Sequence, residues 1–119
     1  MPTYTRQWEL ELLSGETEIA AILTDEKLSA VKRMLEKDHA IDCLLLLYLG
    51  KGRWKNAKSF MTDLGLTLSD GTFRSRMMEI EALGFAESVR IDPLKKYYVK
   101  TEFGERVAQL LLHFFEEIK

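Results

Sequence analysis

Residues 66–104 constrain the fold most, because a helix pattern, a glycine and two strand patterns follow one another there. Ser69 can cap a helix, and Asp70 suits the positive end of the helix dipole. Apolar residues then recur at helical spacing on one side: Phe73, Met77, Ile80 and Leu83. Gly84 is suited to the left-handed position that often ends a helix. The pattern predicts a helix over about residues 70–83 with one buried side.

The opposite side of this predicted helix carries mostly short or basic residues: Gly71, Thr72, Arg74, Ser75 and Met78, with Arg76 and Glu79 at its margins. Arginine, serine and threonine on an exposed helix are side chains that contact base edges in the major groove of DNA. We therefore expect Thr72, Arg74 and Ser75 to contact bases. Alone, the pattern is more typical of a solvated helix face with one arginine, but the flanking segments favour base contact.

Both flanks of the helix match parts of a DNA-binding motif. Upstream, residues 56–64 form a short amphipathic pattern that ends at Gly65, and residues 66–68 make a turn. Downstream, residues 85–91 and 97–100 are rich in β-branched and aromatic residues, and the Asp92-Pro93 pair between them favours a turn. The order predicts a helix-turn-helix followed by a β-hairpin, with Leu94, Lys95 and Lys96 near its tip.

Residues about 39–119 resemble the winged helix of MarR-like and PadR-like transcriptional regulators. The residues that carry the resemblance are Leu68 to Arg74, Leu83-Gly84-Phe85, Asp92-Pro93 and Tyr98 to Gly104. The resemblance implies an α+β, mainly helical winged helix-turn-helix with a β-hairpin wing. It also implies that the helix at about 70–83 enters the major groove and that the wing, at about 85–100, contacts the backbone or minor groove.

The length of 119 residues, 46% of them hydrophobic, fits a single core. The longest apolar run, Cys43 to Leu49, is far shorter than the roughly twenty residues of a membrane-spanning helix. The first residues do not resemble a secretory signal, and a single cysteine suits a reducing compartment. These features predict a cytoplasmic protein with no membrane partner.

The net charge of −2 argues against nucleic-acid binding, but the charge is unevenly distributed. Residues 1–50 hold five Lys/Arg and nine Asp/Glu, a balance of −4, and residues 101–119 hold two and four, a balance of −2. Residues 51–100 hold ten and six, a balance of +4. The positive charge therefore coincides with the predicted helix-turn-helix and hairpin, where it can attract DNA.

Several cations in this central part are candidates for contacts with the DNA backbone. Lys51, Arg53 and Lys55 surround Trp54 in a segment with Gly52, and such a loop can hold phosphates. A tryptophan that only closes the edge of the core explains the loop equally well. The complete set of expected backbone contacts is Lys51, Arg53, Lys55, Lys58, Arg76, Lys95 and Lys96.

The N-terminal part fits either a strand or a helix. Alternation over residues 4–12 favours a strand, Ser14-Gly15 a turn and residues 17–23 a return strand, although the latter also fit a helix. Thr24 is expected to cap a further helix that ends near residue 38. We therefore expect a strand/helix extension over residues 1–37, which the resemblance suggests is a dimerisation arm, and a winged helix-turn-helix domain over residues 38–119.

The two remaining helix patterns concern the core and assembly. Residues 41–49 are apolar on nearly every side, so we expect a central helix with Cys43 buried and structural rather than reactive. The last helix begins near Glu102 and has more apolar surface than one small domain covers. We expect it to form a homodimer through Leu111, Phe114, Phe115 and Ile118.

The sequence favours a sequence-specific transcriptional regulator that binds double-stranded DNA. No nucleotide-binding loop, nucleophile with a base or metal-ligand cluster is evident, so we expect neither an enzyme nor a cofactor or metal site. The alternatives are a winged helix that assembles proteins and a protein that coats DNA without sequence preference. The pattern identifies no operator and no small-molecule effector.

Overall fold

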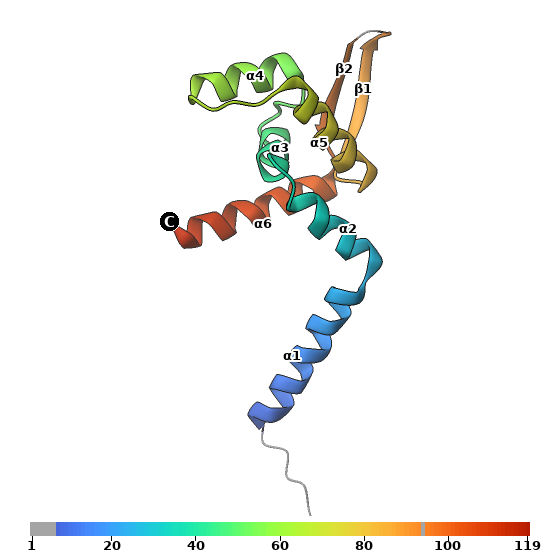
Figure 1. Ribbon diagram of the computed structural model, residues 1–119, viewed down its shortest axis with the longest axis vertical. Helices are drawn as coiled ribbons and strands as arrows, with labels where there is room; N and C mark the ends of the chain where they lie inside the picture. The colour runs from blue at the N-terminus through green and yellow to red at the C-terminus, as the bar shows by residue number, and fades with distance from the viewer. Residues whose placement is uncertain (1–6, 94) are drawn as a thin grey trace, which may run out of the picture. The chain divides into compact units, whose positions relative to one another are not determined.

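The computed structural model describes residues 7–93 and 95–119, which form an α+β structure that is mainly helical (Figure 1). Two β-strands in this part of the chain form an antiparallel hairpin. The elements are α1 (Gln7–Thr24), α2 (Glu26–Leu35), α3 (Ala40–Tyr48), α4 (Trp54–Asp63), α5 (Asp70–Ala82), β1 (Ala86–Asp92), β2 (Lys95–Lys100) and α6 (Glu102–Ile118). The chain divides between Arg33 and Met34 into two compact units. None of the described helices is both long and apolar enough to cross a membrane.

The first unit is helical, and the strands predicted there are wrong. Residues 7–24 form the single helix α1, with Ser14-Gly15 inside it rather than in a turn. The start of the first predicted strand, residues 4–6, lies outside the described residues. Leucine, glutamate and alanine dominate the segment and favour helix, and an isolated two-stranded hairpin is only marginally stable in water. One glycine in a helix costs only about 1 kcal/mol, which the rest of α1 outweighs.

The cap of the second helix also differs by one residue from the prediction. The Thr24 hydroxyl donates to the Ala20 carbonyl at 2.8 Å, so Thr24 completes α1. The Asp25 side chain accepts from the Leu28 amide at 2.8 Å and caps α2. Both residue types are good caps, and Asp25, which directly precedes α2, takes the role here.

The second unit has its core around α3, as the apolar pattern predicted. This helix contacts α5, α6 and β2. Its buried residues are Ala40, Cys43, Leu44, Leu46 and Leu47. Cys43 is 0% exposed, which confirms its prediction as a buried residue. Burial, together with the nearby Asp42 carboxylate, raises the pKa of the Cys43 thiol to about 12.

Helices α4 and α5 form the predicted pair around a short turn. Gly65 follows α4 with a φ of 74°, in the left-handed region, and residues 66–68 are not helical. The Ser69 hydroxyl accepts from the Thr72 amide at 3.1 Å, which confirms Ser69 as the cap of α5. Gly84 has a φ of 85° after the end of α5, as predicted. The buried residues of α5 are Phe73, Met77 and Ile80.

The hairpin is fastened to the rest of the second unit at several points. The Tyr98 amide donates to the Gly52 carbonyl at 2.9 Å, so the segment between α3 and α4 lies beside β2. The Glu81 carboxylate accepts from the Ser88 amide at 2.8 Å, and hydrogen bonding from Ser88 lowers the pKa of that carboxyl. The Thr101 amide donates to the Phe85 carbonyl at 3.1 Å. These contacts fix the hairpin beside α5.

Candidate nucleic-acid interface

One face of α5 is exposed along its whole length. Its residues follow helical spacing and are all exposed: Gly71, Arg74, Ser75, Met78 and Ala82. We name this set the outer row of α5. Apart from Arg74 and Met78, the members of the outer row have small side chains, so this face of α5 is accessible to solvent along the helix. Two of the three predicted base-contacting residues, Arg74 and Ser75, belong to the outer row.

Arg74 is oriented by a carboxylate on its own helix. Its Nε donates to Asp70 Oδ1 at 2.9 Å, and its side chain is 70% exposed. Among the described residues, no hydrogen bond of its two terminal nitrogens is found. An arginine that contacts guanine uses two parallel N–H groups, and these two nitrogens are the pair that remains free for it.

Thr72, the third predicted base contact, lies at the margin of the exposed face. Its hydroxyl accepts a hydrogen bond from the Ser69 hydroxyl at 2.9 Å, while its amide donates back to Ser69. The side chain is half-buried. Thr72 is therefore part of the helix cap, and its hydroxyl is less available to a ligand than that of Ser75.

A depression of about 280 Å³ separates α5 from the hairpin. It is lined by Trp54, Phe73, Arg74, Met78, Lys96 and Tyr98. The Trp54 and Phe73 rings are tilted, with centroids 5.3 Å apart, and Lys96 Nζ lies 5.1 Å from the Tyr98 ring centroid. Two cations and three aromatic rings thus surround the depression, and none of the described residues that line it is acidic. Trp54 packs at the edge of the core and also forms part of this surface.

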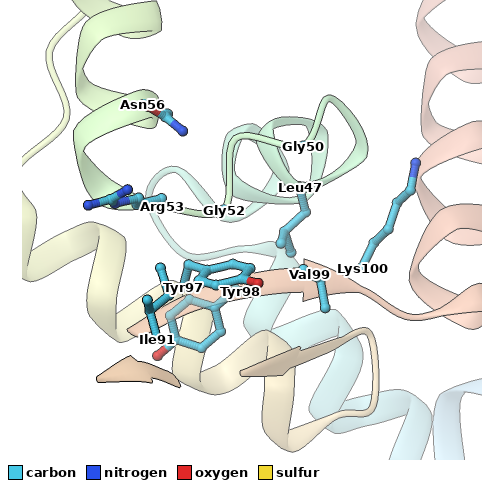
Figure 2. A pocket seen from close by; sticks show the side chains of 10 residues that line it. All are labelled: Leu47, Gly50, Gly52, Arg53, Asn56, Ile91, Tyr97, Tyr98, Val99 and Lys100. Atoms are coloured by element: carbon cyan, nitrogen blue, oxygen red, sulfur yellow. The ribbon is translucent and has the colours of Figure 1, made fainter. Parts of the chain in front are cut away.

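A second cleft, of about 520 Å³, is lined by Gly52 and by residues of α4 and β2 (Figure 2). Figure 2 shows Arg53 and Asn56 above the rings of Tyr97 and Tyr98. Arg53 caps α4 through its backbone, without a side-chain hydrogen bond to the helix. Arg53, which was predicted to contact the DNA backbone, therefore lies next to the cleft rather than on the outer row.

The remaining predicted backbone contacts on α4 and the hairpin differ in exposure. Lys55 and Lys58 are exposed on α4, and Lys95 and Lys96 are exposed on β2. Both hairpin lysines belong to the strand, and the Lys95 amide donates to Asp92 Oδ1 at 2.8 Å. Lys51 is half-buried, with its Nζ 5.9 Å from the Phe60 ring centroid.

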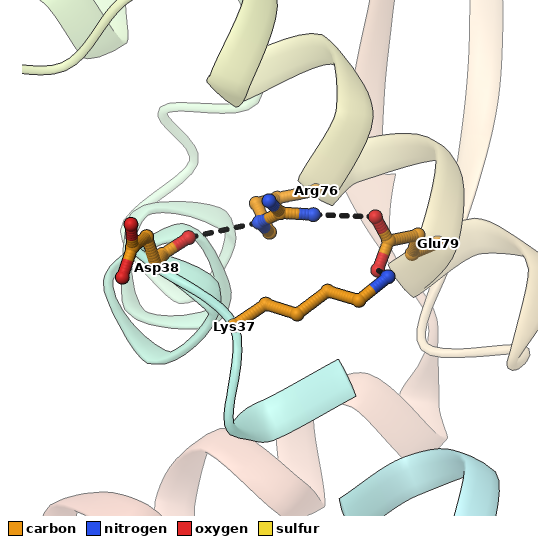
Figure 3. A network of polar contacts seen from close by, with 4 residues as sticks. All are labelled: Lys37, Asp38, Arg76 and Glu79. Carbon is orange, nitrogen blue, oxygen red and sulfur yellow. Dashed lines mark hydrogen bonds and ion pairs between the residues drawn. The ribbon is translucent and has the colours of Figure 1, made fainter. Parts of the chain in front are cut away.

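Arg76 is placed differently from the other predicted contacts (Figure 3). Its side chain is only 16% exposed, and its Nε donates to the Asp38 carbonyl at 2.8 Å. Its Nη1 forms an ion pair with Glu79, which Lys37 also approaches at 2.9 Å. The guanidinium joins α5 to the turn before α3. Its helical position at the margin of the exposed face did not indicate this structural role.

The predicted dimerisation residues lie on the last turns of α6. After Ala108 no residue of this helix is buried. Phe114, Phe115 and Ile118 are exposed, as is Leu110, while Leu111 is half-buried. The Phe114 and Phe115 rings meet edge to face at 5.4 Å. The C-terminal half of α6 therefore presents an apolar surface to solvent.

Among the described residues, no group of three His, Cys, Asp or Glu side chains gathers in a way that could hold a metal ion. The chain was also compared with models of known families, with characterised proteins and with solved structures, and none of the three comparisons found a match.

Two features of this interface could not be anticipated from the residue types alone. Met78 has the helical spacing of four from Arg74 that places it in the outer row, but its apolar side chain was not considered a base contact. Tyr98 and Trp54, from distant parts of the chain, form the wall beside it. Helical spacing predicted the position of Met78 on the outward side of the helix, whereas the approach of Trp54 and Tyr98 depends on tertiary packing.

Proposed function

We propose that the second unit is a winged helix-turn-helix that binds double-stranded DNA and regulates transcription. In this proposal α5 is the recognition helix in the major groove, and the β1–β2 hairpin is the wing on the adjacent backbone or minor groove. The observation that carries the proposal is the depression between α5 and the hairpin. Arg74 and Lys96 lie 22 positions apart in the chain and yet line the same depression, and no acidic side chain is among the described residues around it.

The outer row of α5 supplies the chemistry for base recognition. The Asp70 carboxylate accepts from Nε of Arg74, and in the proposed complex the two terminal nitrogens donate to O6 and N7 of a guanine. Ser75 lies beside Arg74 and can donate to or accept from a neighbouring base. Gly71 has no side chain, so the helix backbone can approach the bases closely at that end.

Exposed cations on both sides of α5 supply the contacts with phosphates. Lys55 and Lys58 lie on α4, and Lys95 and Lys96 lie on β2. Contacts of this kind set the position of a protein on DNA without carrying sequence information. Arg76 is left out of this proposed set because its guanidinium is engaged within the domain.

The apolar end of α6 supports a homodimer. Its exposed side chains, Leu110, Phe114, Phe115 and Ile118, fall within nine residues of one helix. A second copy of the same helix offers an equivalent surface, so the pairing closes by twofold symmetry. Such a dimer presents two α5 helices to two half-sites about one helical turn of DNA apart.

The first experiment measures binding of the full chain to a fluorescently labelled random duplex as a function of salt. Affinity should fall steeply, by about 0.9 logarithmic units per phosphate contact for each decade of salt. Replacement of Lys95 and Lys96 together by alanine should lower this slope by up to about two contacts per subunit. The matched control, Arg106→Ala with Lys119→Ala, removes the same charge from an exposed position of α6 and from the exposed residue that follows it, and should leave the slope unchanged.

Selection from a pool of random duplexes then distinguishes specific recognition from uniform coating of DNA. A consensus with twofold symmetry is the expected result. Binding with the same slope but without a consensus contradicts sequence-specific regulation. Absence of binding at low salt contradicts the proposal as a whole.

One observation favours a second candidate function, a winged helix that assembles proteins. The hairpin exposes Val89, Ile91 and Val99, and Val89 pairs directly with Tyr97 across the strands. A wing that only contacts phosphates has no need of such apolar side chains. In that case the protein binds no DNA at low salt, and substitution of Val89 and Val99 by serine abolishes binding of a protein partner instead.

A further inference from the structure

Met78 is the one large apolar side chain of the outer row. It is 59% exposed, at the centre of a face whose other members are Gly71, Arg74, Ser75 and Ala82. The core side of α5 is already filled by Phe73, Met77 and Ile80, so Met78 is not needed for packing. In the proposed complex this surface faces DNA, and burial of the exposed thioether against an apolar group of the DNA is favourable.

The surroundings of Met78 extend this apolar surface. Met78 lines the depression with the rings of Trp54 and Tyr98, while Arg74 and Lys96 add positive charge at its sides. A ligand that fits must therefore be anionic overall and must present a small apolar group next to hydrogen-bond acceptors. In the major groove the apolar group at the base edges is the C5-methyl of thymine, and it lies beside the acceptors of neighbouring bases.

The spacing of Met78 and Arg74 gives the register of this contact. Four residues correspond to about 6 Å along a helix, since each residue rises about 1.5 Å. Base pairs are stacked about 3.4 Å apart, so two side chains separated by this distance contact bases about two steps apart. When α5 lies along the groove, Arg74 then contacts a guanine, and Met78 contacts a thymine about two base steps away.

We propose that Met78 is a specificity-determining residue that contacts the C5-methyl of a thymine about two base pairs from the guanine bound by Arg74. This inference rests on the proposed function, because it assigns a base preference to the same α5 face. In the proposed contact, the rings of Trp54 and Tyr98, which line the same depression as Met78, add apolar surface beside the thioether. The contact therefore buries the methyl group more completely than a lone methionine would.

The test removes one methyl group from the DNA at a time. The probes are the duplex selected from the random pool and a series of the same duplex in which each thymine in turn is replaced by deoxyuridine. At one position per half-site the wild-type protein should bind about threefold to fivefold more weakly, the effect of leaving one methyl group in water. The other thymines should show no such change.

Two substitutions then assign the effect to Met78. Met78→Ala shortens the side chain at an exposed position, and it should bind thymine and deoxyuridine duplexes equally. Met78→Leu keeps an apolar end of similar volume, and it should retain the preference for thymine. Circular dichroism and thermal unfolding of both variants should match the wild type, since the residue is exposed.

Each contrary outcome has a separate meaning. Specific DNA binding with no thymine position sensitive to the methyl group overturns the role of Met78 and leaves the proposed function standing. An equal preference for thymine in wild type and Met78→Ala overturns it too, because another residue then contacts the methyl. Failure to bind any DNA at low salt overturns both the proposed function and this inference.

Discussion

Gly52→Ala should destabilise the second unit severely, although it adds only one methyl group. A Cβ at this position would lie 1.8 Å from the carbonyl oxygen and 2.7 Å from the carbonyl carbon of Tyr98. Both are backbone atoms of β2, so no side-chain rotation relieves the overlap. The strand has to move away, and the hydrogen bond from the Tyr98 amide to the Gly52 carbonyl is lost with it.

The expected cost follows from these two effects. Overpacking of a well-packed site costs about 1–3 kcal/mol, and a lost hydrogen bond about 0.5–1.5 kcal/mol. We therefore expect the free energy of unfolding of Gly52→Ala to fall by about 1.5–4.5 kcal/mol. For a domain of this size, that lowers the Tm by at least about 6 °C.

Denaturation in urea, followed by circular dichroism, measures this difference. Gly71→Ala is the matched control, because a Cβ at Gly71 meets no atom within 4 Å and the residue lies in a helix. It should be neutral or stabilising by up to about 1 kcal/mol. If Gly52→Ala unfolds at the same urea concentration as the wild type, the segment between α3 and α4 does not hold the hairpin in place, and the geometry beside α5 is not the one described.

Three further outcomes are expected. Arg76→Ala should lower the free energy of unfolding by about 1–3 kcal/mol because it leaves the Asp38 carbonyl without its donor. In the same urea titration Arg74→Ala, at an exposed position, should change the free energy of unfolding by less than about 0.5 kcal/mol. Equal stabilities of the two variants would contradict the structural role of Arg76. In sedimentation, Phe114→Glu should shift a dimer toward monomer while Gln109→Glu, which adds the same charge to the same helix, should not, and a monomeric wild type at micromolar concentration would refute the dimer. The folded-state pKa of Cys43, about 12, lies above the value of 9.0 for a free thiol, so the contribution of the buried thiol to stability is complete below pH 9 and is lost as the pH rises toward 12. Cys43→Ala should therefore flatten the dependence of the free energy of unfolding on pH between 9 and 12. An unchanged slope would contradict the burial of Cys43.

Local signals in the sequence predicted the second unit well. Ser69, Gly65 and Gly84 act within one turn of a helix, so their roles depend on few neighbours and were confirmed. The hairpin strands were also found close to their predicted positions. Such elements are determined by capping and by turn geometry, both of which are visible in a short window of sequence.

The prediction of N-terminal strands was wrong because apolar–polar alternation is a weak signal for a strand when the alternating residues are leucine and glutamate. Both residues favour helix, and the energetic preference is summed over the eighteen residues of α1. The role of Arg76 was missed for a different reason. Its partner, the Asp38 carbonyl, is 38 positions away in the sequence, and only tertiary packing brings the two together.

The sequence predicted the cations of the candidate site but not the aromatic residues that line it. Arg74, Ser75 and the hairpin lysines follow from helical spacing and from the turn at Asp92-Pro93. The depression with Trp54 and Tyr98 requires α4, α5 and β2 to meet, and no periodicity within one segment indicates that. Met78 belongs to both categories, since its position was predictable and its chemical surroundings were not.

Substitution of Arg74 measures whether α5 recognises bases. We expect Arg74→Ala to bind the selected duplex about 1–3 kcal/mol more weakly than the wild type and to bind random duplex with nearly the same affinity. Lys58→Ala, which removes another exposed cation, should weaken binding to both duplexes alike. If Arg74→Ala weakens binding to selected and random DNA equally, Arg74 contacts phosphate, and α5 does not recognise bases through it.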